Sequence, residues 1–220
     1  MLKTGRILGL LAVTLAAPTT SRADSWAIPK TFQVTSKDGG HRLTVEPSFG
    51  DRPSPTTKDA TGKAVRPKAL GKLEKKSKEG RFEVVWEHAL ANDVSPVRAL
   101  VADDGSVVTL DNWHSMGYGP DVVVVFAPDG KLVRSMGLED FLSKEEVGNL
   151  PHSVSSIWWG SGHHLDDKQE FLTLNVGNGG LAPGDRDIPK KTVRVRLKTG
   201  EIIKDGAGEP NEAHPDTKPK

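Results

Sequence analysis

The chain has 220 residues, with 30 Lys and Arg against 29 Asp and Glu, and no cysteine. The formal net charge of +1 gives no electrostatic reason to expect nucleic acid or an anionic membrane as a partner. Without cysteine the chain can form no disulfide, so its stability must come from packing alone.

The N-terminal segment has the pattern of a signal peptide. Lys3 and Arg6 precede the apolar stretch Ile7–Ala17, whose eleven residues are too few to span a bilayer. Ser21 and Ala23 are small residues at the −3 and −1 positions of a cleavage site. We therefore expect cleavage after Ala23 and export to the periplasm or the cell exterior. A retained membrane anchor is the alternative, and a lipid anchor is not expected because no cysteine follows the apolar stretch.

Removal of residues 1–23 takes away three basic residues, which leaves 27 basic and 29 acidic side chains and a net charge of −2. The remaining 197 residues are enough to bury a core and to form one or two domains. We expect one β-repeat domain over residues 24–204. A disordered tail is expected over 205–220, which lacks apolar groups to bury, and the polar, Pro-rich segment 48–68 is expected to be disordered as well.

The mature chain repeats one pattern three times. Each unit has two strand–turn–strand segments, and the first two units turn at Asp-Gly or Glu-Gly. The first unit comprises Phe32–Pro47 and Lys72–Leu90, the second Arg98–Asn112 and Val122–Leu142, and the looser third Ser156–Val176 and Val193–Ile203. The units therefore cover about 30–90, 97–142 and 154–204, and each predicts four antiparallel strands.

The second unit resembles a blade of a β-propeller. The run ADDGSVVTLDN followed by VVVVFAPDGKLVRSMG is similar to the NHL-type blade, in which an Asp-Gly strand pair precedes a second hairpin. The resemblance implies a fold and no particular function, since propeller blades host many functions. Closed propellers usually have about four to eight blades, and this chain has three units. It could form an open arc, or two chains could pool six blades.

The distribution of apolar residues favours the open arc. In the first unit apolar residues alternate with polar ones, which predicts one apolar face; these are Phe32, Val34, Phe82, Val84 and Trp86. The third unit alternates in the same way along Val193–Leu197, whereas Val122–Phe126 of the second unit is apolar on both faces. A sheet with two apolar faces must be covered on both sides, and a sheet with one can end a stack. We therefore expect an all-β fold of three four-stranded antiparallel sheets stacked as an open, propeller-like arc. It should be monomeric, with the six-bladed dimer as the alternative.

A short helical segment is expected near 138–149. Ser143 and Glu146 have the spacing of a capping box, and Pro151 marks the end of the helix.

The longer connections are expected on one face of the protein. In a four-stranded meander, the loop between the second and third strands lies at the end opposite the two turns. This rule groups loops 48–68, 112–120 and 177–191. Because binding residues are often carried by loops on a rigid scaffold, we expect this face to bind a peptide, a glycan or a cell-surface protein.

The middle loop carries candidate ligand-binding residues. Trp113 and Tyr118 could stack on a sugar ring or cover an apolar group, and Asp111, Asn112 and His114 could donate or accept hydrogen bonds. In the alternative interpretation, Trp113 covers the end of the sheet and Asp111 or Asn112 caps the turn. His114 beside Ser115 is not a catalytic pair, because a nucleophile and its base must face each other.

A second cluster has side chains of the metal-binding type. His163, His164, Asp166 and Asp167 could hold zinc or a similar ion, although the run is placed where the first hairpin of the third unit should turn. It should then lie at the end opposite His114. We expect a non-enzymatic binding or scaffold protein with no cofactor and no catalytic residues. The alternative is an exported hydrolase or metal-dependent enzyme that uses His114 or the 163–167 cluster.

Overall fold

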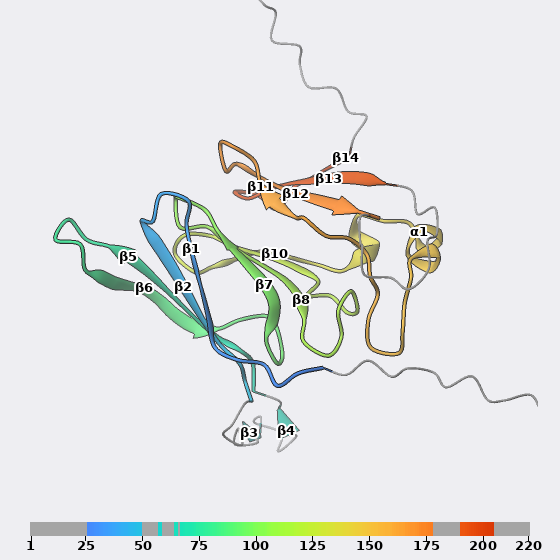
Figure 1. Ribbon diagram of the computed structural model, residues 1–220, viewed down its shortest axis with the longest axis horizontal. Helices are drawn as coiled ribbons and strands as arrows, with labels where there is room; N and C mark the ends of the chain where they lie inside the picture. Colours follow the sequence, from blue (N-terminus) through green and yellow to red (C-terminus); the bar gives the residue numbers. More distant parts are fainter. Residues whose placement is uncertain (1–25, 50–56, 59–63, 66, 178–189, 205–220) are drawn as a thin grey trace, which may run out of the picture.

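The computed structural model describes residues 26–49, 57–58, 64–65, 67–177 and 190–204. They form three four-stranded antiparallel sheets in an open arrangement (Figure 1). The first sheet contains β1 (Phe32–Thr35), β2 (His41–Glu46), β5 (Leu70–Lys76) and β6 (Phe82–Ala89). The second contains β7 (Pro96–Val101), β8 (Val107–Asn112), β9 (Val123–Phe126) and β10 (Leu132–Met136). The third contains β11 (His164–Leu165), β12 (Phe171–Val176), β13 (Lys191–Arg196) and β14 (Ile202–Lys204).

Within each sheet the strands are neighbours in chain order, so each sheet is a meander. The predicted all-β fold of three four-stranded sheets is thereby confirmed, and the described strands close into no barrel. The arrangement is compatible with a repeat of blades. A separate two-stranded ribbon joins β3 (Thr57–Lys58) and β4 (Ala64–Val65) within the connection from β2 to β5.

The second sheet separates two hydrophobic cores. Val107, Val124 and Phe126 pack toward the first sheet, against residues such as Leu43 and Leu73. The alternate residues on the other face of the second sheet belong to the core shared with the third sheet; these are Val108, Leu110, Val123 and Val125, which pack with Leu172, Leu174, Val193 and Val195. Every residue of β8 and β9 is buried, as the two-sided apolar pattern predicts.

One detail of the expected alternation is wrong. A β-bulge shifts the pairing of β5 and β6 between Leu73, which lies opposite Trp86, and Glu74, which lies opposite Val84. One extra residue of β6, Val85, then separates Val84 from Trp86, while their partners are adjacent, so the two side chains take opposite faces. Trp86 is buried and Val84 is exposed. Phe82 lies on the same side of the bulge as Val84 and contacts Arg42 on the outer face, so the expected inward position is wrong for both residues.

The outer faces of the end sheets are covered by arginine and phenylalanine pairs. Arg42 lies 4.1 Å above the ring of Phe82 and forms a 2.9 Å ion pair with Glu74. In the third sheet, Arg194 and Arg196 lie 4.1 and 4.6 Å from the ring of Phe171. These polar outer faces fit the ends of a stack.

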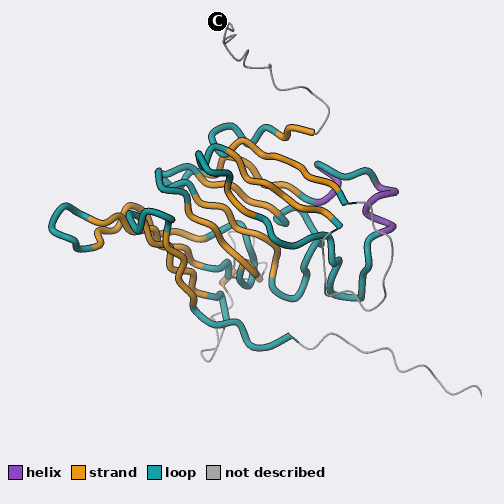
Figure 2. The backbone as a smooth tube through the Cα atoms, turned by 45° about the horizontal axis from the view of Figure 1, so that its top comes forward, coloured by secondary structure: helices purple, strands orange, loops and turns teal. Residues whose placement is uncertain are grey.

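The helical segment follows the second sheet as expected. It consists of the short η1 (Leu138–Asp140) and α1 (Lys144–Asn149). The Ser143 hydroxyl accepts from the Glu146 N–H, and the Glu146 carboxylate accepts from the Ser143 N–H, so the predicted capping box is confirmed. Figure 2 shows these helical segments at one side of the three sheets. No helix among the described residues is long and apolar enough to cross a membrane.

The sheets have two distinct ends. Tight turns join the first two and the last two strands of each sheet and lie toward the upper left of Figure 1, an end that we call the turn end. The connection from β8 to β9 lies at the lower right, with the N-terminal segment 26–31 running past it, and we call this the loop end. The segments 1–23, 178–189 and 205–220, and most of 48–68, lie outside the described residues.

Candidate functional site

The loop from β8 to β9 is anchored by Asp111. This residue has a positive φ of 60° and a buried side chain. Its Oδ1 accepts hydrogen bonds from the N–H of Gly117 at 2.8 Å and from Nε1 of Trp159 at 2.9 Å. Burial raises the pKa of Asp111 to about 6, against the lowering effect of these two donors. The carboxylate therefore lies beneath the loop and fixes its course.

Asn112 belongs to a buried amide network at the base of the same loop. The Asn92 side-chain amide donates to Asn112 Oδ1 at 3.0 Å and to the carbonyl of Asp111 at 3.1 Å. Asn92 Oδ1 in turn accepts from the Thr109 hydroxyl at 2.8 Å. Both asparagines are buried, so these side chains position the loop from below.

The rest of the loop is attached to the segment that leads into the third sheet. The N–H of Ile157 donates to the Met116 carbonyl at 2.8 Å, and the Tyr118 hydroxyl donates to the Ser153 carbonyl at 2.8 Å. A Cβ on Gly117, which has φ +75°, would lie 2.8 Å from the backbone oxygen of Ile157. The loop thus packs against residues 153–157 with no room for a larger side chain at this position.

Trp113 and His114 reach the surface, where two distant segments supply further aromatic rings. The ring of Trp26 lies 5.4 Å from that of Trp113 and 5.6 Å from that of His114. Phe49 stacks on His114 at 6.1 Å with an interplanar angle of 13°. We call Trp26, Phe49, Trp113 and His114 the aromatic cluster.

The indole N–H groups of the cluster are bound within the protein. Trp113 Nε1 donates to the carbonyl of Ala27 at 2.9 Å, and Trp26 Nε1 donates to the Ser155 hydroxyl at 3.2 Å. These bonds join the N-terminal segment to the loops at 113 and 155 and hold the rings in place. Ile28 and Val154, next to two of the bonded residues, are exposed apolar side chains. We call the aromatic cluster together with Ile28 and Val154 the loop-end surface.

The predicted ligand-binding residues therefore separate into two groups. Trp113 and His114 are brought together at the surface, whereas Asp111 and Asn112 are buried beneath them and Tyr118 turns toward Ser153. Trp26, Phe49, Ile28 and Val154 were not expected from the sequence. The sequence gives two hints: Trp26 is the third residue after the expected cleavage site, and Phe49 belongs to loop 48–68, which was expected on this face.

The predicted metal-binding residues do not converge. His163 is buried and stacks on Trp159 at 4.3 Å, and its Nδ1 accepts from the backbone N–H of Asn175 at 3.2 Å. Burial, with smaller effects of Arg98 and His164, lowers the pKa of His163 to about 4. His164 is exposed, with Nδ1 at 3.0 Å from the Gly162 carbonyl.

The hairpin turn of the third sheet also lies later than expected. His164 is part of β11, and the turn is closed by the Gln169 N–H, which donates to the Asp166 carbonyl at 2.9 Å. Asp166 Oδ1 accepts from the Phe171 N–H at 3.0 Å, and Asp167 is exposed. No group of three or more His, Asp or Glu side chains in the described part of the chain is arranged to hold a metal.

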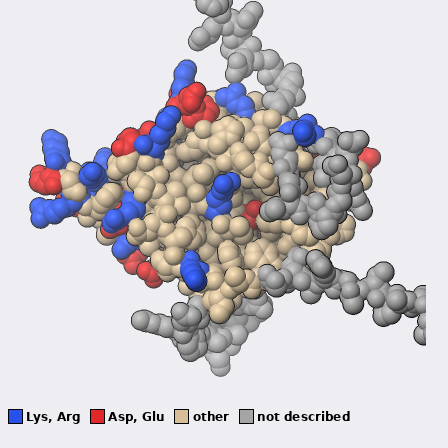
Figure 3. All heavy atoms as spheres, viewed as in Figure 1, with Lys and Arg blue, Asp and Glu red and all other residues tan. Residues whose placement is uncertain are grey.

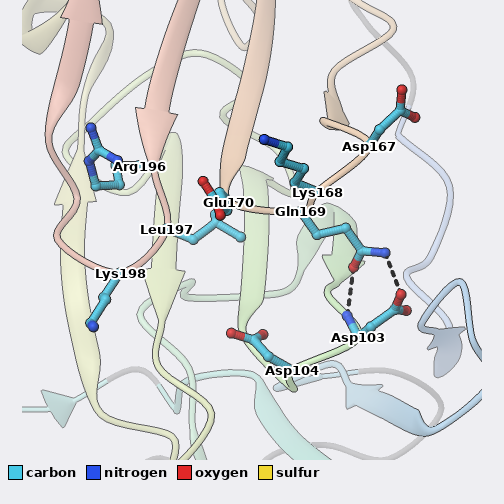
Figure 4. A pocket seen from close by; sticks show the side chains of 9 residues that line it. All are labelled: Asp103, Asp104, Asp167, Lys168, Gln169, Glu170, Arg196, Leu197 and Lys198. Atoms are coloured by element: carbon cyan, nitrogen blue, oxygen red, sulfur yellow. Dashed lines mark hydrogen bonds between the residues drawn. The ribbon is translucent and has the colours of Figure 1, made fainter. Parts of the chain in front are cut away.

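Two hollows lie away from the loop end. The larger, of about 560 Å³, opens between the turns of the second and third sheets and carries both signs of charge (Figure 4). Its lining residues are Asp103, Asp104, Asp167, Lys168, Gln169, Glu170, Arg196, Leu197 and Lys198. The smaller, of about 230 Å³, lies between the first strands of the three sheets, β1, β7 and β11.

Charge is distributed unevenly over the surface. In the view of Figure 3, Lys, Arg, Asp and Glu side chains gather at the left and upper rims, which Figure 1 places over the turn end. The segments that form the loop-end surface, 26–31, 48–49, 112–118 and 151–156, contain no acidic residue, and Lys30 is their single Lys or Arg. The nearest charged pair outside these segments is Lys68 with Asp93, since the neighbouring Val94 and Ser95 carbonyls accept from the Ser48 and Trp113 N–H groups.

Comparison of the chain with protein-family models and with curated proteins gave no match.

Proposed function

We propose that this is an exported, non-enzymatic binding protein that contacts its partner through the loop-end surface. The aromatic cluster supports the proposal most directly, because its rings come from three segments far apart in the sequence. Isolated exposed apolar residues are ordinary on protein surfaces, whereas a contiguous aromatic group is typical of interaction sites.

The support beneath the cluster is consistent with binding. Asp111 holds the loop through Gly117 and Trp159, and Asn92 holds its base. The rings are thus presented by a scaffold that is already ordered, which reduces the conformational entropy lost when a partner binds.

The alternative of an enzyme that uses His114 has less support. The neighbours of His114 are the rings of Trp26 and Phe49, and the described residues form no hydrogen bond to its side chain. A general base normally has a group that orients it.

Nuclear magnetic resonance can test the proposal with nitrogen-15-labelled residues 24–220. The probes are a soluble hexamer of β-1,4-linked N-acetylglucosamine, a proline-rich decapeptide and phosphatidylcholine bicelles. We expect at least one probe to shift amide signals of 26–31 and 112–118 and the indole signals of Trp26 and Trp113. Trp113→Ala should abolish those shifts, and Trp158→Ala, outside the cluster, should retain them. The proposal fails if no probe changes these chemical shifts, or if the changes lie at the turns 37–40, 102–106 and 166–170.

A further inference from the structure

We infer that the loop-end surface docks on the interface of a lipid bilayer, without spanning it. The inference rests on the proposed function and names the partner. Peptide and glycan are other classes of partner for the same surface, and the experiment below separates them from lipid.

The first observation is that aliphatic side chains project from this end of the molecule. Val154 is 99% exposed and Ile28 61%, and Phe49, which stacks on His114, is 39% exposed. Ile28 and Val154 flank the aromatic rings, because their neighbours Ala27 and Ser155 accept the indole hydrogen bonds. Contact with the hydroxyl groups of a glycan would give these aliphatic side chains little hydrophobic free energy. Insertion at the acyl boundary of a bilayer would remove them from water and so stabilise the complex.

The second observation concerns the two tryptophans. Tryptophan is enriched at membrane interfaces, where its ring is buried and its N–H finds a polar partner. Here the N–H of Trp26 and that of Trp113 already donate to Ser155 and Ala27. The rings can therefore enter an apolar layer without leaving a donor unsatisfied. They also have no free N–H to offer to a peptide carbonyl, which favours lipid over an extended peptide.

The third observation is the charge around the surface. Its four segments contain no Asp or Glu, in a chain that has 29 of them, and Lys30 is exposed two residues after Ile28. Asp93, which precedes the Val94 that bonds Ser48, is paired with Lys68, so the two charges offset each other. Lys30 then remains as a cation that attracts the phosphate groups of lipid head groups.

The fourth observation is the position of the surface in the chain. Trp26 and Ile28 are the third and fifth residues after the expected cleavage site. Because the leader of an exported chain enters the membrane before it is cut, export would bring these two residues close to a lipid surface.

The experiment uses purified residues 24–220 and vesicles of phosphatidylcholine alone or mixed equally with phosphatidylglycerol. Co-sedimentation measures binding, and phosphatidylcholine brominated near the head group measures quenching of tryptophan fluorescence. We expect the wild-type chain to sediment with both vesicles and to be quenched. Ile28→Asp and Val154→Asp should each weaken binding at least about tenfold.

Matched controls are available at other exposed aliphatic residues. Val84 and Leu132 are 57% and 56% exposed on strands of the first and second sheets, so Val84→Asp and Leu132→Asp should leave vesicle binding unchanged. Unfolding midpoints of all four variants check that they fold. Lipid docking is overturned if the wild-type chain stays in the supernatant, or if the control variants weaken binding equally. If the chain does not bind vesicles while the glycan or the peptide still shifts the loop-end signals, lipid docking is rejected and the proposed function is retained.

Discussion

Asp103 and Gln169 exchange two hydrogen bonds between the turns of the second and third sheets. The Asp103 N–H donates to Gln169 Oε1 at 2.6 Å, and Gln169 Nε2 donates to Asp103 Oδ2 at 2.6 Å (Figure 4). Asp103 Oδ1 also accepts from the backbone N–H of Asp38, in the first turn of the first sheet, at 2.9 Å. One carboxylate therefore links the turns of all three sheets.

This link should be measurable as coupled stability. We expect Asp103→Ala to lower the free energy of unfolding by about 2 kcal/mol and Gln169→Ala by about 1 kcal/mol. The double variant should be little less stable than Asp103→Ala, because the two residues share their bonds. Urea unfolding provides the measurement, and Lys168→Ala, on an exposed neighbouring side chain, is the control. Additive losses in the double variant would contradict a direct link.

Asp111→Asn should stabilise the protein at neutral pH. The folded-state pKa of Asp111, about 6, lies above its ordinary value of 3.8, so the carboxyl group adds stability below pH 4 and loses it as the pH rises to 6. The difference corresponds to about 3 kcal/mol. Asparagine keeps an oxygen acceptor for Gly117 and Trp159 and tolerates the positive φ. We expect a gain in unfolding free energy at pH 7.5 and none at pH 4. A loss at pH 7.5 would show that the charge itself is required.

His163 should contribute a pH dependence of stability opposite to that of Asp111, and His163→Asn should remove it. The pKa of His163 falls from 6.5 to about 4 in the folded protein, so its contribution is complete above pH 6.5 and decreases as the pH falls to 4, by about 3 kcal/mol. In the wild-type chain this trend opposes that of Asp111, so unfolding free energy should change little between pH 4 and 6.5. His163→Asn should leave the Asp111 trend visible, with stability falling as the pH rises. Urea titrations at several pH values measure the slope, and an unchanged slope would contradict the assignment.

Gly117→Ala should detach the loop locally. Its Cβ would lie 2.8 Å from both Cβ and the backbone oxygen of Ile157 at a positive φ, so we expect a loss of about 2–3 kcal/mol. Gly119 has φ +86° and open space around it, and Gly119→Ala should cost only about 1 kcal/mol. Hydrogen exchange of the Ile157 N–H, bonded to Met116, should accelerate in the first variant alone. Equal effects of the two variants would argue against a tight contact.

The chain should be a monomer in solution. The outer face of the first sheet presents the paired charges of Arg42 and Glu74, and that of the third presents Arg194 and Arg196. Pairing these faces in a six-bladed dimer would bury charges at a cost in desolvation. Sedimentation equilibrium gives the mass directly, and a clean dimer would favour the six-bladed assembly.

The sheets could be predicted because their determinants are local. Asp-Gly turns and alternating apolar residues specify the hairpins, and the two-sided run Val122–Phe126 identifies the central sheet. The exceptions follow from changes in local register. The bulge in β6 places Phe82 and Val84 on the outer face instead of the inner one. His164 and Leu165 form a strand where a turn was expected, because the turn begins at Asp166.

The loop-end surface could be predicted only in part, because it depends on tertiary contacts. Trp113 and His114 could be identified from their loop, but Trp26 joins them through the N-terminal segment and Phe49 through the connection after β2. The burial of Asp111 likewise depends on Trp159, which is 48 residues away in sequence. Hydrophobic periodicity carries no information about such contacts.

The separation of the two cores by a central sheet has a consequence for lengthening the chain. A duplicate of residues 96–142 placed after the original would meet an apolar face on each side, as the original does between Leu43 and Leu172. A duplicate of the first or third unit would instead bury a charged face against an apolar one. The architecture therefore permits growth by insertion at its centre and resists growth at its termini, so longer arrays should differ in the number of internal units and keep the same two ends.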